Sequence, residues 1–257
     1  MHKASPGRVL GALAAALLAG ACGFSTPPAA AQTPDLSKPF GYATNILAQG
    51  TMSTLPAGVI YANVIDLPQD SGGSITHAHV AGFVYGVAGV HSMPIDGGAT
   101  QTVNPGEAAF IGAGVKHSHI NPGQSPNDWY FISLRPTAAR SAPSIVPGQK
   151  VLYATEDLNT PLAPGAYSEQ LDRLVIAPGG RGAPLSHAGF EMDYVLSGSL
   201  IIHGEGGTAK TVHVGEGFVR LPGTATQDYA GSAGVTYLAF FATLEGQPFE
   251  TELGRPL

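Results

Sequence analysis

Short apolar or alternating runs, separated by turn-forming residues, are the feature that most limits the possible fold of this chain. The runs cover residues 58–67, 82–90, 107–113, 129–136, 172–180, 192–204, 210–221 and 234–246. Gly, Pro, Asn and Asp separate them, and the chain contains 35 Gly and 21 Pro. No segment after residue 32 keeps an apolar period of about 3.6 residues over any length. Strand-length runs between turns are typical of all-β sandwiches and barrels, so the sequence predicts an all-β fold.

The two halves of the chain share an order of features. The segment "NPGEAAFIGAG" in the first half corresponds to "HVGEGFVRLPG" in the second, about 110 residues later. A repeat of that length is too long for a solenoid and fits a duplicated domain. We therefore expect two similar β domains, at 40–140 and 150–257, joined near 137–149 by a segment with little periodicity.

The first 31 residues read as a secretory signal peptide. Lys3 and Arg8 precede an apolar run over 9–21, and three alanines end at residue 31. The run is shorter than the ~20 residues that span a bilayer, and the pattern as a whole is that of a cleaved signal. We expect a secreted or periplasmic protein. Cys22, in "LAGAC", is the only cysteine and leaves a lipid anchor at that residue as an alternative.

Charge excludes one class of partner. Without the two cations of residues 1–31, the chain has 10 Lys and Arg against 18 Asp and Glu. No basic patch is present for nucleic acid, and no apolar segment is long enough for a membrane span. A small-molecule substrate or ligand is the expected partner, and a homodimer is possible.

A pair of histidines, His77 and His79, lies in the apolar stretch "ITHAHVAGF". Residues i and i+2 of a strand project to the same face. Two imidazoles in an apolar environment are costly without partners, and a metal ion commonly binds neutral imidazole. His117, which follows a predicted strand and a tight turn, can provide a third ligand. His119 shares its face and is interpreted as a pocket residue.

Here the chain resembles the cupins. Their second motif, G-x5-P-x-G-x2-H-x3-N, is matched by Gly106, Gly114, His117 and Asn121, with Gly112 in place of proline. Their first motif, G-x5-H-x-H-x3,4-E-x6-G, is matched at His77 and His79. The motif's glutamate falls at Phe83 or Gly82, neither of which is a carboxylate. The resemblance implies two tandem jelly-roll barrels, with a metal site at His77, His79 and His117.

The C-terminal half departs further from the cupin motifs. His187 and Glu191 fall at the second histidine and the acid, whereas Leu185 and Thr226 replace the other two histidines. We therefore expect no metal in this half unless His203 or His213 contributes. Such a half would complete the fold without a site of its own.

Strand periodicity or position along the chain also predicts where three other residues lie. Tyr85 is an even number of residues from His77 and His79, so it is predicted to point into the same pocket. His91 lies beyond Gly89 and is expected to be exposed or at the pocket rim. Trp129 is expected to belong to the core.

The resemblance implies a metal-dependent enzyme. Three-histidine cupins include non-haem Fe(II) dioxygenases, so a dioxygenase-like oxidoreductase acting on a small anionic, bidentate substrate is the first hypothesis. One divalent ion is implied, Fe(II) being favoured, with Zn, Mn, Ni or Cu as alternatives. A secreted, non-catalytic bicupin that binds a small molecule or a metal is the second hypothesis. A Lewis-acid reaction is also open.

Overall fold

The computed structural model describes residues 35–142, 146–158 and 162–257, and residues 35–257 form one compact unit. The predicted signal peptide and Cys22 lie outside the described residues. The described residues form β-strands joined by turns, with a short 3-10 helix, η1 (Thr137–Ser141), and no α-helix among them. The all-β prediction is confirmed. No helix within the described part of the chain is long and apolar enough to cross a membrane.

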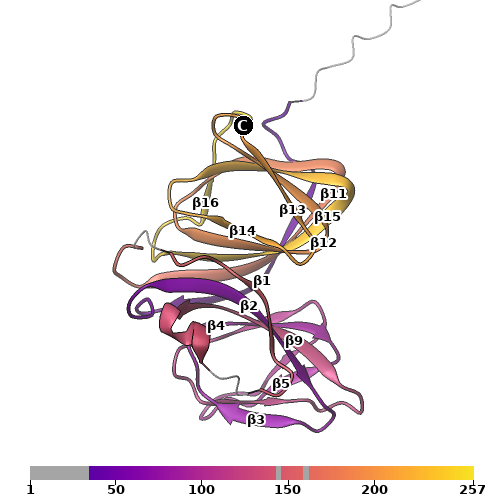
Figure 1. Ribbon diagram of the computed structural model, residues 1–257, viewed down its shortest axis with the longest axis vertical. Coiled ribbons are helices and arrows are strands. Elements are labelled where there is room, and N and C mark those ends of the chain that lie inside the picture. The colour runs from indigo at the N-terminus through magenta and orange to yellow at the C-terminus, as the bar shows by residue number, and fades with distance from the viewer. Residues whose placement is uncertain (1–34, 143–145, 159–161) are drawn as a thin grey trace, which may run out of the picture. The chain divides into compact units, whose positions relative to one another are not determined.

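The N-terminal half contributes two antiparallel sheets (Figure 1). The five-stranded sheet has the order β10 (Lys150–Ala154), β2 (Ile60–Gln69), β9 (Asn127–Pro136), β4 (Gly82–Ala88) and β7 (Ala108–Ile111). The four-stranded sheet has the order β3 (Ser74–His77), β8 (His117–Ile120), β5 (His91–Met93) and β6 (Gln101–Val103). The two sheets together make the N-terminal barrel.

A seven-stranded antiparallel sheet makes the C-terminal barrel. Its path is β1 (Phe40–Met52), β11 (Tyr167–His187), β15 (Ala225–Leu244), β12 (Phe190–Gly204) and β13 (Ala209–His213). Two further strands pair beside this path, β14 (Gly217–Arg220) with β12 and β16 (Glu250–Glu252) with β11. The long strands β11, β12 and β15 bend at register shifts, which lets one sheet curl around a core.

Two strands pair with the opposite half of the chain. β1 pairs with β11 of the C-terminal sheet, although the sequence prediction placed its residues in the domain 40–140. β10 pairs with β2 of the N-terminal sheet, although its residues begin the predicted domain 150–257. Hydrogen bonding therefore crosses between the halves at both places. The domain limits 40–140 and 150–257 stay a prediction.

The buried apolar side chains form three clusters, which alternation along the strands explains. On β2, Ile65 and Leu67 face the interior of the N-terminal barrel, whereas Ala62 and Val64 face a core shared by the two barrels. β15 divides its side chains in the same way between the shared core and the interior of the C-terminal barrel. Strands buried on both faces read as nearly continuous apolar runs, which is why no clean polar alternation marks them.

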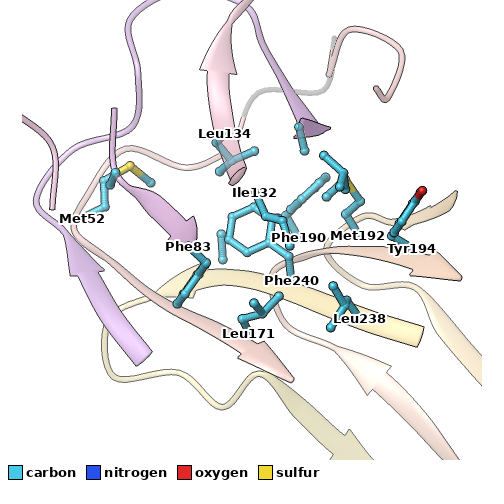
Figure 2. Packing of buried hydrophobic residues seen from close by; sticks show 14 of the residues in the cluster. Met52, Phe83, Ile132, Leu134, Leu171, Phe190, Met192, Tyr194, Leu238 and Phe240 are labelled. Atoms are coloured by element: carbon cyan, nitrogen blue, oxygen red, sulfur yellow. The ribbon is translucent and has the colours of Figure 1, made fainter. Parts of the chain in front are cut away.

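The shared core joins the five-stranded sheet to β11, β12 and β15. Figure 2 shows Phe83, Ile132 and Leu134 of the N-terminal strands close to Phe190 and Phe240 of the C-terminal strands. The rings of Phe83 and Phe240 meet edge to face with centroids 5.8 Å apart, a favourable geometry for aromatic pairs. This packing holds β9, the strand that carries Trp129, Phe131 and Arg135 of the cavity lining described below.

Candidate metal centre

Four histidines come together beside the interior core of the N-terminal barrel. His77 ends β3 and lies directly opposite His117, the first residue of β8, so both side chains project to one face. His119 follows on the same face of β8. His79 lies beyond the end of β3, where its carbonyl accepts a hydrogen bond from the N–H of Gly114 at 2.8 Å. One nitrogen of each of these four histidines lies within 4.8 Å of the others.

Hydrogen bonds to the backbone orient two of the rings. Nδ1 of His79 donates to the carbonyl of Val80 at 2.6 Å, and Nδ1 of His117 donates to the carbonyl of Val115 at 2.8 Å. A proton held at Nδ1 leaves the lone pair on Nε2. This is the arrangement of metal-bound histidines, whose other nitrogen is usually fixed by a carbonyl or a carboxylate.

The unpartnered nitrogens of the cluster test whether a metal fits. Both ring nitrogens of His77 and Nε2 of His79 are buried and have no hydrogen-bond partner. Buried polar atoms normally find partners, so these orphaned nitrogens indicate a missing ligand. A divalent ion held by His77, His79 and His117 would satisfy one nitrogen of His77 and Nε2 of His79, and the three predicted ligands therefore fit a metal ion.

His119 connects the cluster to a residue whose role the sequence did not reveal. Its Nε2 lies 2.9 Å from Nε2 of His117, and its Nδ1 lies 2.8 Å from Nε2 of His91. His91 is 1% exposed, so the prediction that it is exposed or at the rim is wrong. The reason is that β5 pairs with both β6 and β8, which turns His91 inward beside His119.

An amide sets the direction of this histidine chain. Asn127 Nδ2 donates to the carbonyl of Val90 at 2.8 Å and lies 3.4 Å from Nδ1 of His91. With a donor facing Nδ1, His91 carries its proton on Nε2 and donates to His119, which in turn donates from Nε2 toward His117. His119 therefore presents an N–H to the cluster.

Burial keeps these imidazoles neutral. Loss of solvent lowers the pKa of His79 to about 4, against a weaker opposing effect of its bond to Val80. Loss of solvent also lowers the pKa of His91 to about 4. Burial, followed by the charge of His117, lowers the pKa of His77. Neutral imidazole is the form that binds metals, so the cluster is ready to do so at neutral pH.

A small cavity of about 80 Å³ opens against the cluster. Its polar lining includes His77, His79, His119 and Arg135, and its apolar wall is made by Ile65, Leu67, Val80, Trp129 and Phe131. Trp129 is 2% exposed, and its ring stacks on that of His119 with centroids 4.3 Å apart. Trp129 thus belongs to the core and also lines the cavity.

Arg135 is the cationic residue of this cavity lining. Its Nε is buried without a hydrogen-bond partner, and no carboxylate of the described residues forms an ion pair with its guanidinium. Trp129 Nε1 is likewise buried and unpartnered. Unused donors in a cavity favour a ligand that brings acceptor oxygens.

Tyr85 does not lie where the strand periodicity placed it. It faces the shared core, with its ring 6.1 Å from that of Tyr130, and is absent from the cavity lining. The reason is that the chain leaves strand geometry between the end of β3 at His77 and the start of β4 at Gly82. Phe83, at the cupin acid position, also faces the shared core and is 0% exposed.

The comparisons with known proteins agree with this geometry. Residues 63–133 match the family model described as Cupin domain, and that range contains the three predicted ligands. The sequence has no match among the curated proteins.

Solved structures share the fold at low sequence identity. A variant of oxalate decarboxylase from Bacillus subtilis has a TM-score of 0.52 and 13% identity, covering 79% of each chain. Another structure of that enzyme, concerned with its Mn(II) centres, has a TM-score of 0.51 and 14% identity over the same shares. A salicylate 1,2-dioxygenase mutant from Pseudoaminobacter salicylatoxidans has a TM-score of 0.46 and 12% identity, covering 74% of this chain and 75% of that one. The two oxalate decarboxylase structures, with TM-scores above 0.5, support a fold of two tandem cupin barrels, and the cluster of His77, His79, His117 and His119 could hold a metal ion.

Proposed function

We propose that this protein is a metal-dependent oxidoreductase, of the three-histidine Fe(II) dioxygenase type, that acts on a small anionic substrate. One observation carries the proposal: the unpartnered ring nitrogens of His77 and Nε2 of His79 belong to the same small cavity as the guanidinium of Arg135, which forms no ion pair with any described carboxylate. A further support is the fold, in which a Bacillus subtilis oxalate decarboxylase holds Mn(II) centres.

The three ligands would be His77, His79 and His117. Neutral imidazoles leave the charge of a divalent ion uncompensated, which favours an anionic substrate beside it. Iron bound there would supply the one-electron and O₂ chemistry that no side chain of this cluster can supply. No carboxylate joins the four histidines in the described residues, so the substrate has no competitor of its own charge within the cluster.

Arg135 selects the substrate in this proposal. A guanidinium binds a carboxylate through two parallel hydrogen bonds and fixes its orientation as well as its charge. The apolar wall, including Val80 and Phe131, keeps bulk water away and strengthens that interaction. The cavity volume of about 80 Å³ is far below the roughly 300 Å³ or more of sites for drug-sized ligands, so a short carboxylate is the expected substrate class.

His119 has the role of holding a proton beside the substrate. It receives a hydrogen bond from His91 at Nδ1 and presents Nε2–H toward His117. Stacking on Trp129 keeps the ring in place. With Nε2 of His117 bound to a metal ion, the N–H of His119 would no longer have that acceptor and would be available to a substrate oxygen.

The test is O₂ consumption by the Fe(II)-loaded protein with short 2-oxo and 2-hydroxy carboxylates and dicarboxylates. The informative variant is Arg135→Gln, and Arg255→Gln, an exposed arginine paired with Glu205, is the matched control. A hydrogen bond to a charged group contributes about 1.5–3 kcal/mol, so KM should rise about 10- to 150-fold in Arg135→Gln alone. Equal kinetics of the two variants would contradict the role of Arg135. Carboxylate binding without any O₂ uptake would favour the non-catalytic alternative.

A further inference from the structure

The C-terminal barrel contains a second group of side chains with metal-ligating atoms. His187, Glu191 and Glu250 each offer one such atom, and these atoms lie within 4.8 Å of one another. His187 ends β11 and lies directly opposite Glu250 of β16. Glu191 follows at the start of β12, after a two-residue turn. The three residues are separated by up to 63 positions, and the fold brings them together.

Two atoms of this group that could ligate a metal are buried and make no aligned hydrogen bond. His187 is 2% exposed and Glu191 is 3% exposed. Nδ1 of His187 lies 2.5 Å from Oε2 of Glu191 and 3.7 Å from Oε1 of Glu250. Neither Nδ1 of His187 nor Oε2 of Glu191 makes an aligned hydrogen bond. A nitrogen lone pair and a carboxylate oxygen this close repel each other unless a proton or a cation lies beside both.

The other nitrogen of His187 can hold the ring proton, which would leave Nδ1 to act as a ligand. Nε2 lies 3.1 Å from Oγ1 of Thr226, an oxygen that also accepts a hydrogen bond from Nε of Arg220 at 2.9 Å. A proton on Nε2 satisfies this contact and leaves the Nδ1 lone pair directed at Glu191. The hydrogen bond of the second nitrogen is what fixes a ligating histidine.

The charges around the group leave a deficit of cations. Arg220 is 1% exposed and pairs with three carboxylates, Glu191 at 2.8 Å, Asp228 at 2.5 Å and Asp193. Glu250, beside His187, brings a fourth carboxylate, so the group and its surroundings hold four acids and one guanidinium. Buried charges persist when they are paired or bind a metal. If all four were ionised, three negative charges would remain, and a divalent cation would compensate two of them.

We propose that His187, Glu191 and Glu250 form a second divalent-cation site, selective for a cation that binds carboxylate oxygen ligands, such as Mn²⁺. One imidazole and two carboxylates are suitable donors for Mn²⁺. The site revises the sequence expectation of an empty C-terminal half, because Glu250 lies beyond both cupin motifs. Arg220 holds Oε1 of Glu191, which leaves Oε2 for the ion. The inference does not depend on the proposed function of the N-terminal cluster.

The experiment measures Mn²⁺ bound per chain by equilibrium dialysis of the untagged, metal-stripped protein. Glu250→Gln removes a ligand from a side chain that is 28% exposed, so little disturbance of the fold is expected. Glu252→Gln, on the same strand and paired with Lys38 at the surface, is the matched control. The double variant His77→Ala/His79→Ala isolates the C-terminal site.

One fewer Mn²⁺ in Glu250→Gln than in both wild type and Glu252→Gln is the expected result. Equal binding by the three proteins would overturn the proposal and would leave Arg220 and protons as the balancing charges. The double variant gives a second, independent reading. One Mn²⁺ bound there supports the C-terminal site, and none overturns it. If the double variant binds as much as wild type while Glu250→Gln binds less, the C-terminal site stands and the N-terminal proposal fails.

Discussion

Glu169 allows a worked prediction about the shared core. It is 1% exposed, and neither of its carboxyl oxygens has a hydrogen-bond partner. It lies on β11 between Tyr167 and Leu171, two residues of the shared core. Burial raises the pKa of Glu169 to about 8 from its ordinary value of 4.5. The folded protein therefore keeps this carboxyl protonated near neutral pH, whereas the unfolded chain ionises it.

The sign of the pH dependence follows from proton binding. Between pH 4.5 and about 8 the folded state holds more protons at Glu169 than the unfolded state does. Its contribution to stability is complete below the unfolded pKa and is lost as the pH rises toward the folded pKa. At 1.36 kcal/mol per pKa unit, this group lowers the free energy of unfolding by about 3 kcal/mol between pH 5 and pH 7.5.

Glu169→Gln removes the titration while nearly keeping the shape of the side chain. Urea unfolding of wild type and variant at pH 5, 6, 7 and 7.5 measures the difference, in which all other titrating groups cancel. The variant should gain about 3 kcal/mol relative to wild type across that range. Glu245→Gln, at an exposed position, should show no such change. Parallel curves for Glu169→Gln and wild type would refute the assignment of a protonated carboxyl in this core.

Three further predictions concern the fold and the histidines. Gly198 has a φ of +75°, and a Cβ there would overlap the backbone of a neighbouring strand. Gly198→Ala should therefore lower Tm much more than Gly206→Ala does, because Gly206 also has a positive φ but has open space around it. Equal Tm values of the two variants would contradict this. Phe83→Glu should add no metal ligand, which metal titration checks. The same variant should lower the free energy of unfolding by several kcal/mol, which urea unfolding checks, because burying an unpaired charge in an apolar core costs on the order of 3 kcal/mol or more. The contribution of His79 and His91 to the stability of the metal-free protein should fall as the pH drops from about 6.5 toward 4, because burial lowers their pKa values to about 4 and the unfolded state then binds more protons. Since Glu169 acts in the opposite direction over this range, the measurement is the difference in urea unfolding between wild type and His91→Asn, and parallel curves would contradict the prediction.

Short-range patterns in the sequence were sufficient for the fold class and for the grouping of His77, His79 and His117, which the structure brings together. Alternation and turn residues identified most strands, because each depends on neighbours along the chain. The spacing of His77, His79 and His117 places them at the ends of two paired strands. The strand β1 was missed, because its polar and apolar residues do not alternate and its partner β11 is more than 100 residues away.

The remaining parts of both sites depend on contacts between distant segments. Arg135 reaches the cavity from β9, and nothing in its local sequence distinguishes it from an exposed arginine. His91 turns inward because of two strand pairings, and Glu250 faces His187 across β11 and β16. Tyr85 was misplaced because strand periodicity was extended across a break that no local residue pattern revealed.

The central claim is that the cluster of His77, His79 and His117 holds a divalent metal ion. Elemental analysis of the untagged protein, purified without added metal, tests it most directly beside two double variants. His77→Ala/His79→Ala removes two proposed ligands, and His203→Ala/His213→Ala removes two histidines on β12 and β13 that lie outside both groups. The account predicts one divalent ion fewer per chain in the first variant than in wild type and in the second variant. The same metal content in all three proteins would contradict it.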